Sequence, residues 1–228
     1  MKNYKIHLIR HGMTEGNRLG QYIGSLDIPV CEEGFAELRA LKEEYEYPGV
    51  GRVYCSPLLR CRQTAKVLYP EQEPVLINDL REIDFGAFEG KNATDLAGDT
   101  AFGEWVASGF TGTPPEGEDY GDFTKRCAAG LEQVLKDMMQ SDITEAAVIV
   151  HGGVIMNLMA AHSMEKRPPH DWLVGNGKGF TILMSAMLWM RGQMFEMTGA
   201  MPKGLEDLDN ARQWELLKMD IDEDREDA

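Results

Sequence analysis

Two histidines, each following a short, largely apolar run and preceding a glycine, are the residues of this chain best suited to chemistry. His11 comes after the run at 6–10, and His151 comes after the run at 147–150. Such runs are typical of strands buried on both faces of a parallel sheet. Because ligands bind just beyond the carboxyl ends of such strands, two neighbouring strands would place both imidazoles in one crevice.

Further polar residues fall at the end of a predicted strand, in the loop beyond it, or in the first turns of the helix that follows. Arg10 and Arg60 offer guanidinium forks that match phosphate oxygens. The imidazoles offer one nucleophile and one donor, and Glu82 offers a proton for a leaving oxygen. We therefore expect one phosphate site at this edge of the sheet, made of Arg10, His11, Asn17, Arg60, Glu82 and His151.

These residue types favour phosphoryl transfer through a phosphohistidine. A neutral nitrogen of His11 would attack phosphorus in line while the arginines and His151 stabilise charge on the equatorial oxygens. Glu82 would protonate the leaving alkoxide and then act as base toward water, with Asp84 or Glu89 as the alternative acid. We expect no metal and no cofactor, since side chains supply the cations and the histidines lack a metal-binding pattern.

Several segments occur in an order that points to a family. They are Arg10-His11-Gly12-x-Thr14-x-x-Asn17, Gly24-x-x-Asp27-x-Pro29, Ser56-Pro57-x-x-Arg60-x-x-x-Thr64-Ala65, Leu80-Arg81-Glu82-x-Asp84-Phe85-Gly86-x-Phe88-Glu89-Gly90 and His151-Gly152-Gly153. Together, over about residues 5–183, they resemble the histidine phosphatase superfamily, which has the phosphoglycerate mutase-like fold.

The resemblance implies a role for each matched position. It makes His11 the phosphorylated nucleophile and Glu82 the proton donor of a phosphatase. It also implies that Arg10, Arg60 and His151 bind phosphate. Asn17 would support them, and Asn17, Gly24 and Gly152 form the expected substrate-binding set.

The glycine-rich stretch at 83–118 is expected to be a lid over the site. It is poor in cations, with Lys91 alone between Glu82 and Glu118, and it contains Phe85, Phe88, Trp105 and Phe110. Such a lid favours a monophosphate with an apolar or aromatic remainder. The segment resembles the α-ribazole and broad-specificity phosphatases, although Asp119 stands where those relatives often have Ser.

Two other functions stay open at this stage. The first is a phosphoglycerate mutase of the same family, which needs cations for a second phosphate. The second is a non-catalytic phosphate-binding or scaffold protein on the same fold. Arg62 and His170 could also reach the site, whereas His7 and His162 fit structural positions.

The elements that must position the site alternate between strand and helix. This order predicts a three-layer α/β/α fold with a mainly parallel sheet. Strands are expected at 4–10, 52–55, 74–77, 146–150, 180–188 and 194–197. Helices are expected at 32–45, 92–96, 102–107, 122–140 and 154–161. A further helix is expected to have Ser56 as its cap and Pro57 as its first residue, and to end before Pro70.

Composition limits the partners and the compartment. The net charge is −15, which argues against nucleic acid and anionic membranes, so a small phosphate monoester is the expected partner. The four cysteines show no metal spacing, and no signal peptide or membrane span is visible, so we expect a cytoplasmic protein. A homodimer is left open. The catalytic domain is expected at 1–205 and an acidic appendage at 206–228, partly helical over 208–219.

Overall fold

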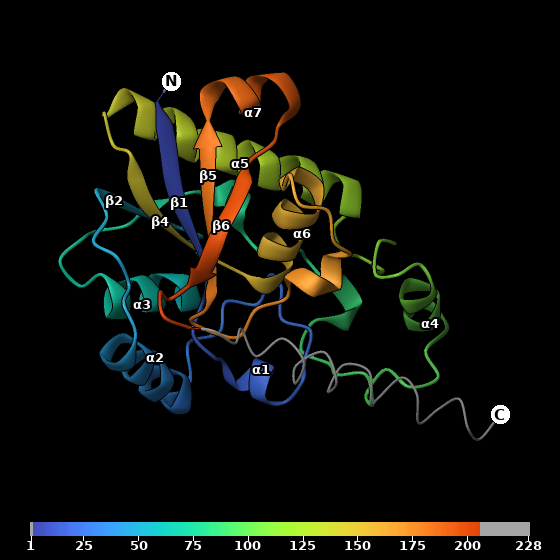
Figure 1. Ribbon diagram of the computed structural model, residues 1–228. Helices are drawn as coiled ribbons and strands as arrows, with labels where there is room; N and C mark the ends of the chain where they lie inside the picture. Colours follow the sequence, from blue (N-terminus) through green and yellow to red (C-terminus); the bar gives the residue numbers. More distant parts are fainter. Residues whose placement is uncertain (1, 206–228) are drawn as a thin grey trace.

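The computed structural model describes residues 2–205. Within them a six-stranded sheet has the order β3-β2-β4-β1-β5-β6 (Figure 1). The first four strands in this order are parallel, β5 runs antiparallel to its neighbour β1, and β6 runs antiparallel to β5. The strands are β1 (Asn3–Arg10), β2 (Arg52–Cys55), β3 (Val75–Leu76), β4 (Glu145–Val150), β5 (Gly179–Ser185) and β6 (Glu196–Met201).

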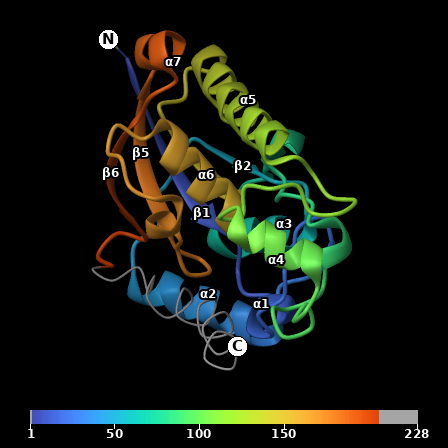
Figure 2. The same ribbon diagram turned by 90° about the vertical axis from the view of Figure 1, so that its right-hand side faces the viewer.

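Helices cover both faces of this sheet. One face packs against α2 and α3, and the other packs against α5 and α6 (Figures 1 and 2). The predicted three-layer, mainly parallel architecture is thus confirmed. The α-helices are α1 (Glu15–Arg18), α2 (Glu32–Glu44), α3 (Leu59–Leu68), α4 (Thr100–Ala107), α5 (Tyr120–Gln140), α6 (Gly152–His162) and α7 (Ala186–Gly192). Short 3-10 turns are η1 (Asn78–Leu80), η2 (Gly86–Phe88) and η3 (Pro169–Trp172).

Strand β4 shows why a nearly continuous apolar run marks the centre of the sheet. Side chains of a strand alternate between its two faces. Val148 and Val150 pack into the cluster beneath α5 and α6, whereas Ala147 and Ile149 pack into the cluster beneath α2 and α3. Residues 146–150 are all fully buried. After Glu145 at its start, this strand therefore carries no polar side chain until His151 follows its carboxyl end.

The helix after β2 begins later than predicted. It starts at Leu59, and Leu58 takes the N-cap position without a side-chain hydrogen bond. Ser56, the predicted cap, has its hydroxyl 2.8 Å from Nε2 of His151. The prediction that Ser56 and Pro57 open the helix is wrong, because a partner distant in the sequence engages the hydroxyl.

The predicted strand at 180–188 is also wrong at its end. β5 stops at Ser185, whose hydroxyl accepts the N–H of Leu188 and thereby caps α7. Helix α7 ends at Gln193, which has a left-handed backbone with φ 48°. The chain then enters β6 at Glu196 rather than at Met194. A serine cap at the end of β5 outweighs the strand pattern of the apolar residues that follow.

Two further differences concern short segments. Residues 92–96 form turns instead of the predicted helix, since the side chains of Asn92 and Asp95 each accept the other's backbone N–H. Between β1 and Pro29, where no helix was predicted, Thr14 and Asn17 form a capping box that starts α1. The acidic appendage and its predicted helix lie outside the described residues.

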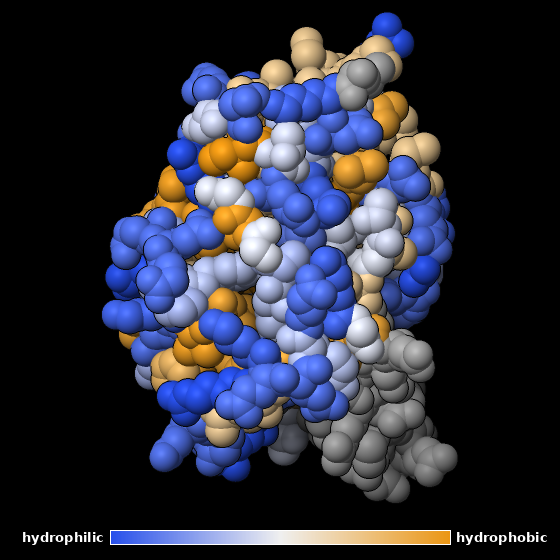
Figure 3. Space-filling model, turned by 60° about the vertical axis from the view of Figure 1, so that its left-hand side comes forward, coloured by the Kyte–Doolittle hydropathy of each residue, from blue (hydrophilic) through white to orange (hydrophobic). Residues whose placement is uncertain are grey.

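One face of the surface shows how polar and apolar residues are distributed. The face drawn in Figure 3 is predominantly hydrophilic, with hydrophobic residues in small separate patches. Large apolar side chains are instead concentrated in the clusters on either side of the sheet. Across residues 2–205, no helix has both the length and the apolar character that crossing a membrane requires.

Two leucines of the sheet provide a test of this arrangement. Leu8 in β1 is fully buried, whereas Leu76 in the edge strand β3 is 51% exposed. We expect Leu8→Ala to lower the free energy of unfolding by about 2–5 kcal/mol, because it loses burial and leaves a cavity. Leu76→Ala should change it by less than about 0.5 kcal/mol. Urea denaturation measures both, and equal losses would contradict the position of β1 inside the sheet.

Candidate active site

The two histidines lie side by side because β1 and β4 are neighbours. Their parallel register pairs Arg10 with Val150, and the backbone N–H of His11 donates to the carbonyl of Val150 at 2.9 Å. The imidazole centroids of His11 and His151 are 5.2 Å apart, with the rings at 63°. His11 is only 4% exposed and His151 is fully buried. The two imidazoles therefore meet beyond the carboxyl ends of β1 and β4, as predicted from the two strand ends.

His11 has the geometry of a nucleophile. Its Nδ1 lies 2.8 Å from the carbonyl oxygen of Gly12, so Nδ1 carries the proton and Nε2 carries a free lone pair. Burial lowers the pKa of His11 well below 6.5, and the positive charges of Arg60 and Arg10 lower it further. At neutral pH the ring is uncharged, which is the form that can attack phosphorus.

His151 is held by two partners in the opposite tautomer. Nε of Arg60 donates to its Nδ1 at 3.3 Å. Its Nε2 lies 2.8 Å from the hydroxyl of Ser56, so Nε2 is the protonated nitrogen. Burial lowers its pKa well below 6.5, followed by the charge of Arg60. Sequence reasoning placed Ser56 in a matched segment but assigned it the wrong role.

Arg60 is a fully buried cation anchored by backbone oxygens. Its Nη1 donates to the carbonyl of Leu26 at 2.7 Å, and its Nη2 donates to the carbonyl of Gly24 at 2.8 Å. A Cβ at Gly24 would lie 1.8 Å from the carbonyl oxygen of Ile83. Gly24 therefore lets its loop approach closely enough to orient Arg60.

Arg10 supplies a second cation, and it is half-buried. Its Nη1 donates to the carbonyl of Val174 at 2.7 Å. Burial lowers the pKa of Arg10 to about 10, against the opposing charge of Glu82, so the group stays protonated at neutral pH. A Cβ at Gly152 would lie 3.3 Å from Nε of Arg10. Gly152 thus lies against this guanidinium, in the first turn of α6.

Glu82 is a buried carboxyl group within the influence of both arginines. Its Oε2 accepts the N–H of Gly153 at 2.9 Å, and its Oε1 accepts the N–H of Ile83 at 3.0 Å. Burial raises the pKa of Glu82, although these hydrogen bonds and the charges of Arg60 and Arg10 oppose the rise. A raised pKa suits a group that must give up a proton during the reaction.

The two alternative acids are engaged elsewhere. The carboxylate of Glu89 accepts backbone N–H groups of Gly24, Ser25 and Phe85. The carboxylate of Asp84 accepts the N–H of Gly86 at 2.9 Å. Glu82 is instead the carboxyl group whose pKa responds to both arginines and whose Oε2 accepts the backbone N–H of Gly153.

Asn17 acts on the loop rather than on the imidazoles directly. Its Oδ1 accepts the N–H of Thr14 at 3.2 Å and the Nδ2–H of Asn176 at 3.3 Å. Asn176 also donates to the carbonyl of His11 at 2.8 Å. Sequence reasoning missed Asn176, which follows no predicted strand and lies 165 residues from its partner.

Three other residues considered from the sequence lie outside this group. Arg62 and His170 are exposed. Asp119 is also exposed, and its carboxylate caps α5 by accepting the N–H of Asp122 at 3.1 Å. Among residues 2–205, no cluster of three or more His, Cys, Asp or Glu side chains is arranged to hold a metal ion.

The predicted lid region contains an aromatic cluster of its own. Phe88, Phe102 and Trp105 are buried together with Leu96. Tyr22, from the loop after α1, packs against this cluster with its ring centroid 5.3 Å from that of Trp105. The segment that carries this cluster is joined to Arg60 through Gly24, since Glu89 accepts the N–H of Gly24 and Arg60 donates to its carbonyl.

Known proteins share both the sequence pattern and the fold. Residues 6–179 match the profile of the histidine phosphatase superfamily (branch 1), so the chain belongs to this superfamily. An adenosylcobalamin/alpha-ribazole phosphatase of Salmonella typhimurium is 29% identical over 160 residues, covering 68% of this chain and 78% of the relative. A 2,3-bisphosphoglycerate-dependent phosphoglycerate mutase of Rhizobium etli is 28% identical over 162 residues, covering 66% of this chain and 76% of the relative.

A solved structure extends the comparison to the fold. The alpha-ribazole phosphatase from Shigella flexneri superposes with a TM-score of 0.72 at 21% identity, covering 89% of this chain and 100% of the other. The predicted superfamily and fold class are confirmed. The predicted class of enzyme, a phosphatase, is confirmed by the family and the named relatives.

The protonation of the two imidazoles can be measured directly. Nitrogen-15 NMR at pH 6.5 should show both rings neutral, because burial and the arginines lower the two pKa values well below 6.5. The proton should be on Nδ1 in His11 and on Nε2 in His151. Spectra of His11→Ala and His151→Ala assign the signals. A half-protonated ring at pH 6.5 would show that the site is more hydrated than described.

Proposed function

We propose that this protein hydrolyses small phosphate monoesters through a phosphohistidine at His11. The observation that carries the proposal is the free Nε2 of a neutral, buried imidazole beside the buried guanidinium of Arg60 and the half-buried guanidinium of Arg10. The guanidinium groups match the geometry of the equatorial oxygens of a phosphoryl group. Because the site is poor in water, the attraction between these charges is stronger than it would be in solution. In this reading Arg10, Arg60 and His151 hold the phosphate.

The reaction divides into two displacements at phosphorus. In the first, Nε2 of His11 attacks phosphorus, the P–N bond forms and the ester P–O bond breaks, while protonated Glu82 gives its proton to the leaving oxygen. In the second, water attacks phosphorus, its proton goes to the Glu82 carboxylate, and the P–N bond breaks. The raised pKa of Glu82 supports the first step. The sum consumes one water and releases an alcohol and inorganic phosphate.

The lid supports a monophosphate with an apolar or aromatic remainder. We assign it to 83–118 within a catalytic domain at 1–205, with 206–228 as an acidic appendage. Its single cation, Lys91, offers little for a second phosphate, which disfavours the mutase. An α-ribazole-phosphate-like substrate fits both the aromatic lid and the named relative. The assembled nucleophile, cations and acid also disfavour a purely phosphate-binding scaffold.

The proposed setting is the cytoplasm. The four cysteines in the described residues are all free, which fits a reducing compartment. The net charge of −15 disfavours nucleic acid as a partner. A homodimer is compatible with this function, and gel filtration with light scattering would decide between one and two copies.

A trapped intermediate tests the proposed reaction. After brief mixing with a labelled phosphate monoester and quenching, the label should be on His11, because its Nε2 is the free nucleophile. The adduct should be labile in acid and stable in base, as expected for a phosphorus–nitrogen bond. His11→Ala should abolish both label and turnover. A label that survives in His11→Ala, or that is stable in acid, would contradict the assignment.

Phe85 tests the proposed substrate class. Its ring contacts the aromatic cluster of the lid and lies beside Gly24, whose carbonyl orients Arg60. Phe85→Ala should lower kcat/KM for phenyl phosphate about three- to tenfold more than for glycerol 3-phosphate, because an aromatic contact is lost. Phe35→Ala, a half-buried aromatic of α2, is the matched control. An equal effect on both substrates would show that the lid does not select aromatic groups.

A further inference from the structure

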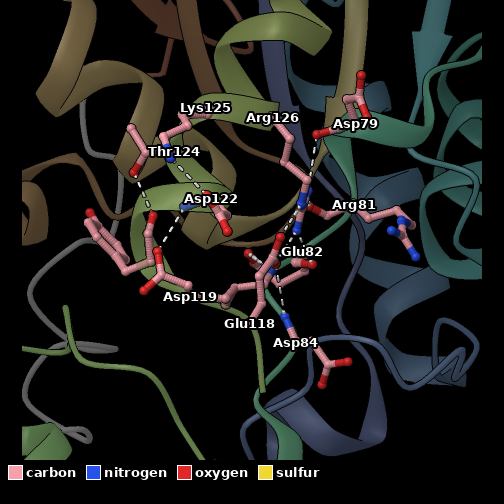
Figure 4. Close-up of polar contacts among 12 residues, drawn as sticks. Asp79, Arg81, Glu82, Asp84, Glu118, Asp119, Asp122, Thr124, Lys125 and Arg126 are labelled. Carbon is pink, nitrogen blue, oxygen red and sulfur yellow. Dashed lines mark hydrogen bonds and ion pairs between the residues drawn. The ribbon is translucent and has the colours of Figure 1, made fainter. Parts of the chain in front are cut away.

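Arg126 in α5 makes an unusually complete set of contacts with the segment that carries Glu82. Its Nη1 donates to the carbonyls of Asp79 at 3.0 Å and Arg81 at 2.6 Å. Its Nη2 donates to the carbonyl of Glu82 at 2.9 Å. Figure 4 shows the guanidinium reaching from the helix to this stretch of backbone. One side chain therefore binds three carbonyls in the four residues that end at Glu82.

A carboxylate fixes this guanidinium from the other side. Glu118 accepts from Nε and Nη2 of Arg126, each at 2.6 Å. The side chains of Arg126 and Glu118 are 16% and 21% exposed, so the ion pair is partly shielded from water. The backbone of Glu118 also donates to the carbonyl of Asp84 at 2.9 Å. The pair thus holds the chain both before and after Glu82 (Figure 4).

This arrangement has a consequence for the carboxyl group of Glu82. Its oxygens are set by the N–H groups of Ile83 and Gly153. The first of these belongs to the segment that Arg126 holds, so a shift of this backbone would move the carboxyl group relative to His11. Small displacements of a reacting group can cost about a hundredfold in rate. Fixing this backbone therefore also fixes the position from which Glu82 donates its proton.

We propose that Arg126, held by Glu118, is a positioning residue that aims the proton of Glu82 at the leaving oxygen. The inference rests on the proposed function, in which Glu82 is the proton donor. A bidentate fork that also reaches three carbonyls requires the planar guanidinium, which lysine cannot replace. Arg126 makes no described hydrogen bond to His11 or to a phosphate-binding side chain, and burial, Arg60, His11 and Arg10 each lower the pKa of His151 more than its charge does. Its main effect is therefore expected on the proton-transfer step.

The dependence on the leaving group tests this role. A 4-nitrophenolate leaves without a proton, whereas an alkoxide needs one, and both 4-nitrophenyl phosphate and 2-phenylethyl phosphate carry an aromatic ring. Arg126→Met should lower kcat/KM for 2-phenylethyl phosphate by about tenfold or more, since general acid catalysis is impaired. For 4-nitrophenyl phosphate the loss should stay below about threefold. Glu118→Gln should also lower kcat/KM more for 2-phenylethyl phosphate than for 4-nitrophenyl phosphate, but by a smaller factor than Arg126→Met.

The matched control is Lys125→Met, which removes a cation from the same helix. Lys125 is 78% exposed and pairs with Asp122, so the ratio of the two kcat/KM values should equal that of the wild type. Thermal melts show whether each variant folds. If Arg126→Met does not fold, Arg126→Lys carries the test, and a wild-type substrate ratio in that variant would overturn the inference.

Glu82→Gln separates failure of this inference from failure of the proposed function. Glu82→Gln should show the largest selective loss on 2-phenylethyl phosphate, and adding Arg126→Met should leave its substrate ratio unchanged, because Arg126 acts through Glu82. If Glu82→Gln lacks this selectivity, the proposed function itself is wrong. If Glu82→Gln is selective but Arg126→Met lowers both substrates equally, only the positioning role is wrong.

Discussion

The parallel pairing of β1 with β4 is the constraint on which the site depends. This register places the N–H of His11 on the carbonyl of Val150, and it brings the two imidazoles within 5.2 Å of each other. A slip of one residue would turn every side chain of a strand to the opposite face. Because β4 is fully buried on both faces, such a slip would disturb both core clusters. The core therefore sets the position of the chemistry.

Burial also determines the charges of the site. It holds both imidazoles uncharged and raises the pKa of Glu82. Backbone carbonyls orient the two guanidinium groups, Arg60 through Gly24 and Leu26 and Arg10 through Val174. Carbonyl anchors hold a cation in place without neutralising it, so its charge stays available for an anion. A protein with a net charge of −15 can thus attract phosphate locally.

The residues of the site that directly follow strand ends could be predicted from the sequence alone. His11 and His151 could be located because a buried run must precede each of them, and α5 could be located from its amphipathic pattern. Ser56 was assigned to a helix cap because its true partner, His151, is 95 residues away. Asn176 and Arg126 were missed for the same reason. Their roles depend on contacts with distant backbone, and no local pattern distinguishes Arg126 from other polar residues of α5.

The configuration at phosphorus tests most directly whether the reaction passes through His11. The substrate is a phosphorothioate monoester made chiral with ¹⁶O and ¹⁸O, the hydrolysis takes place in water labelled with ¹⁷O, and phosphorus NMR of the thiophosphate product reports its configuration. Each in-line displacement inverts phosphorus, so transfer to His11 followed by transfer to water gives net retention. We expect net retention. Net inversion would mean that water attacks the ester directly, and it would contradict the covalent role of His11.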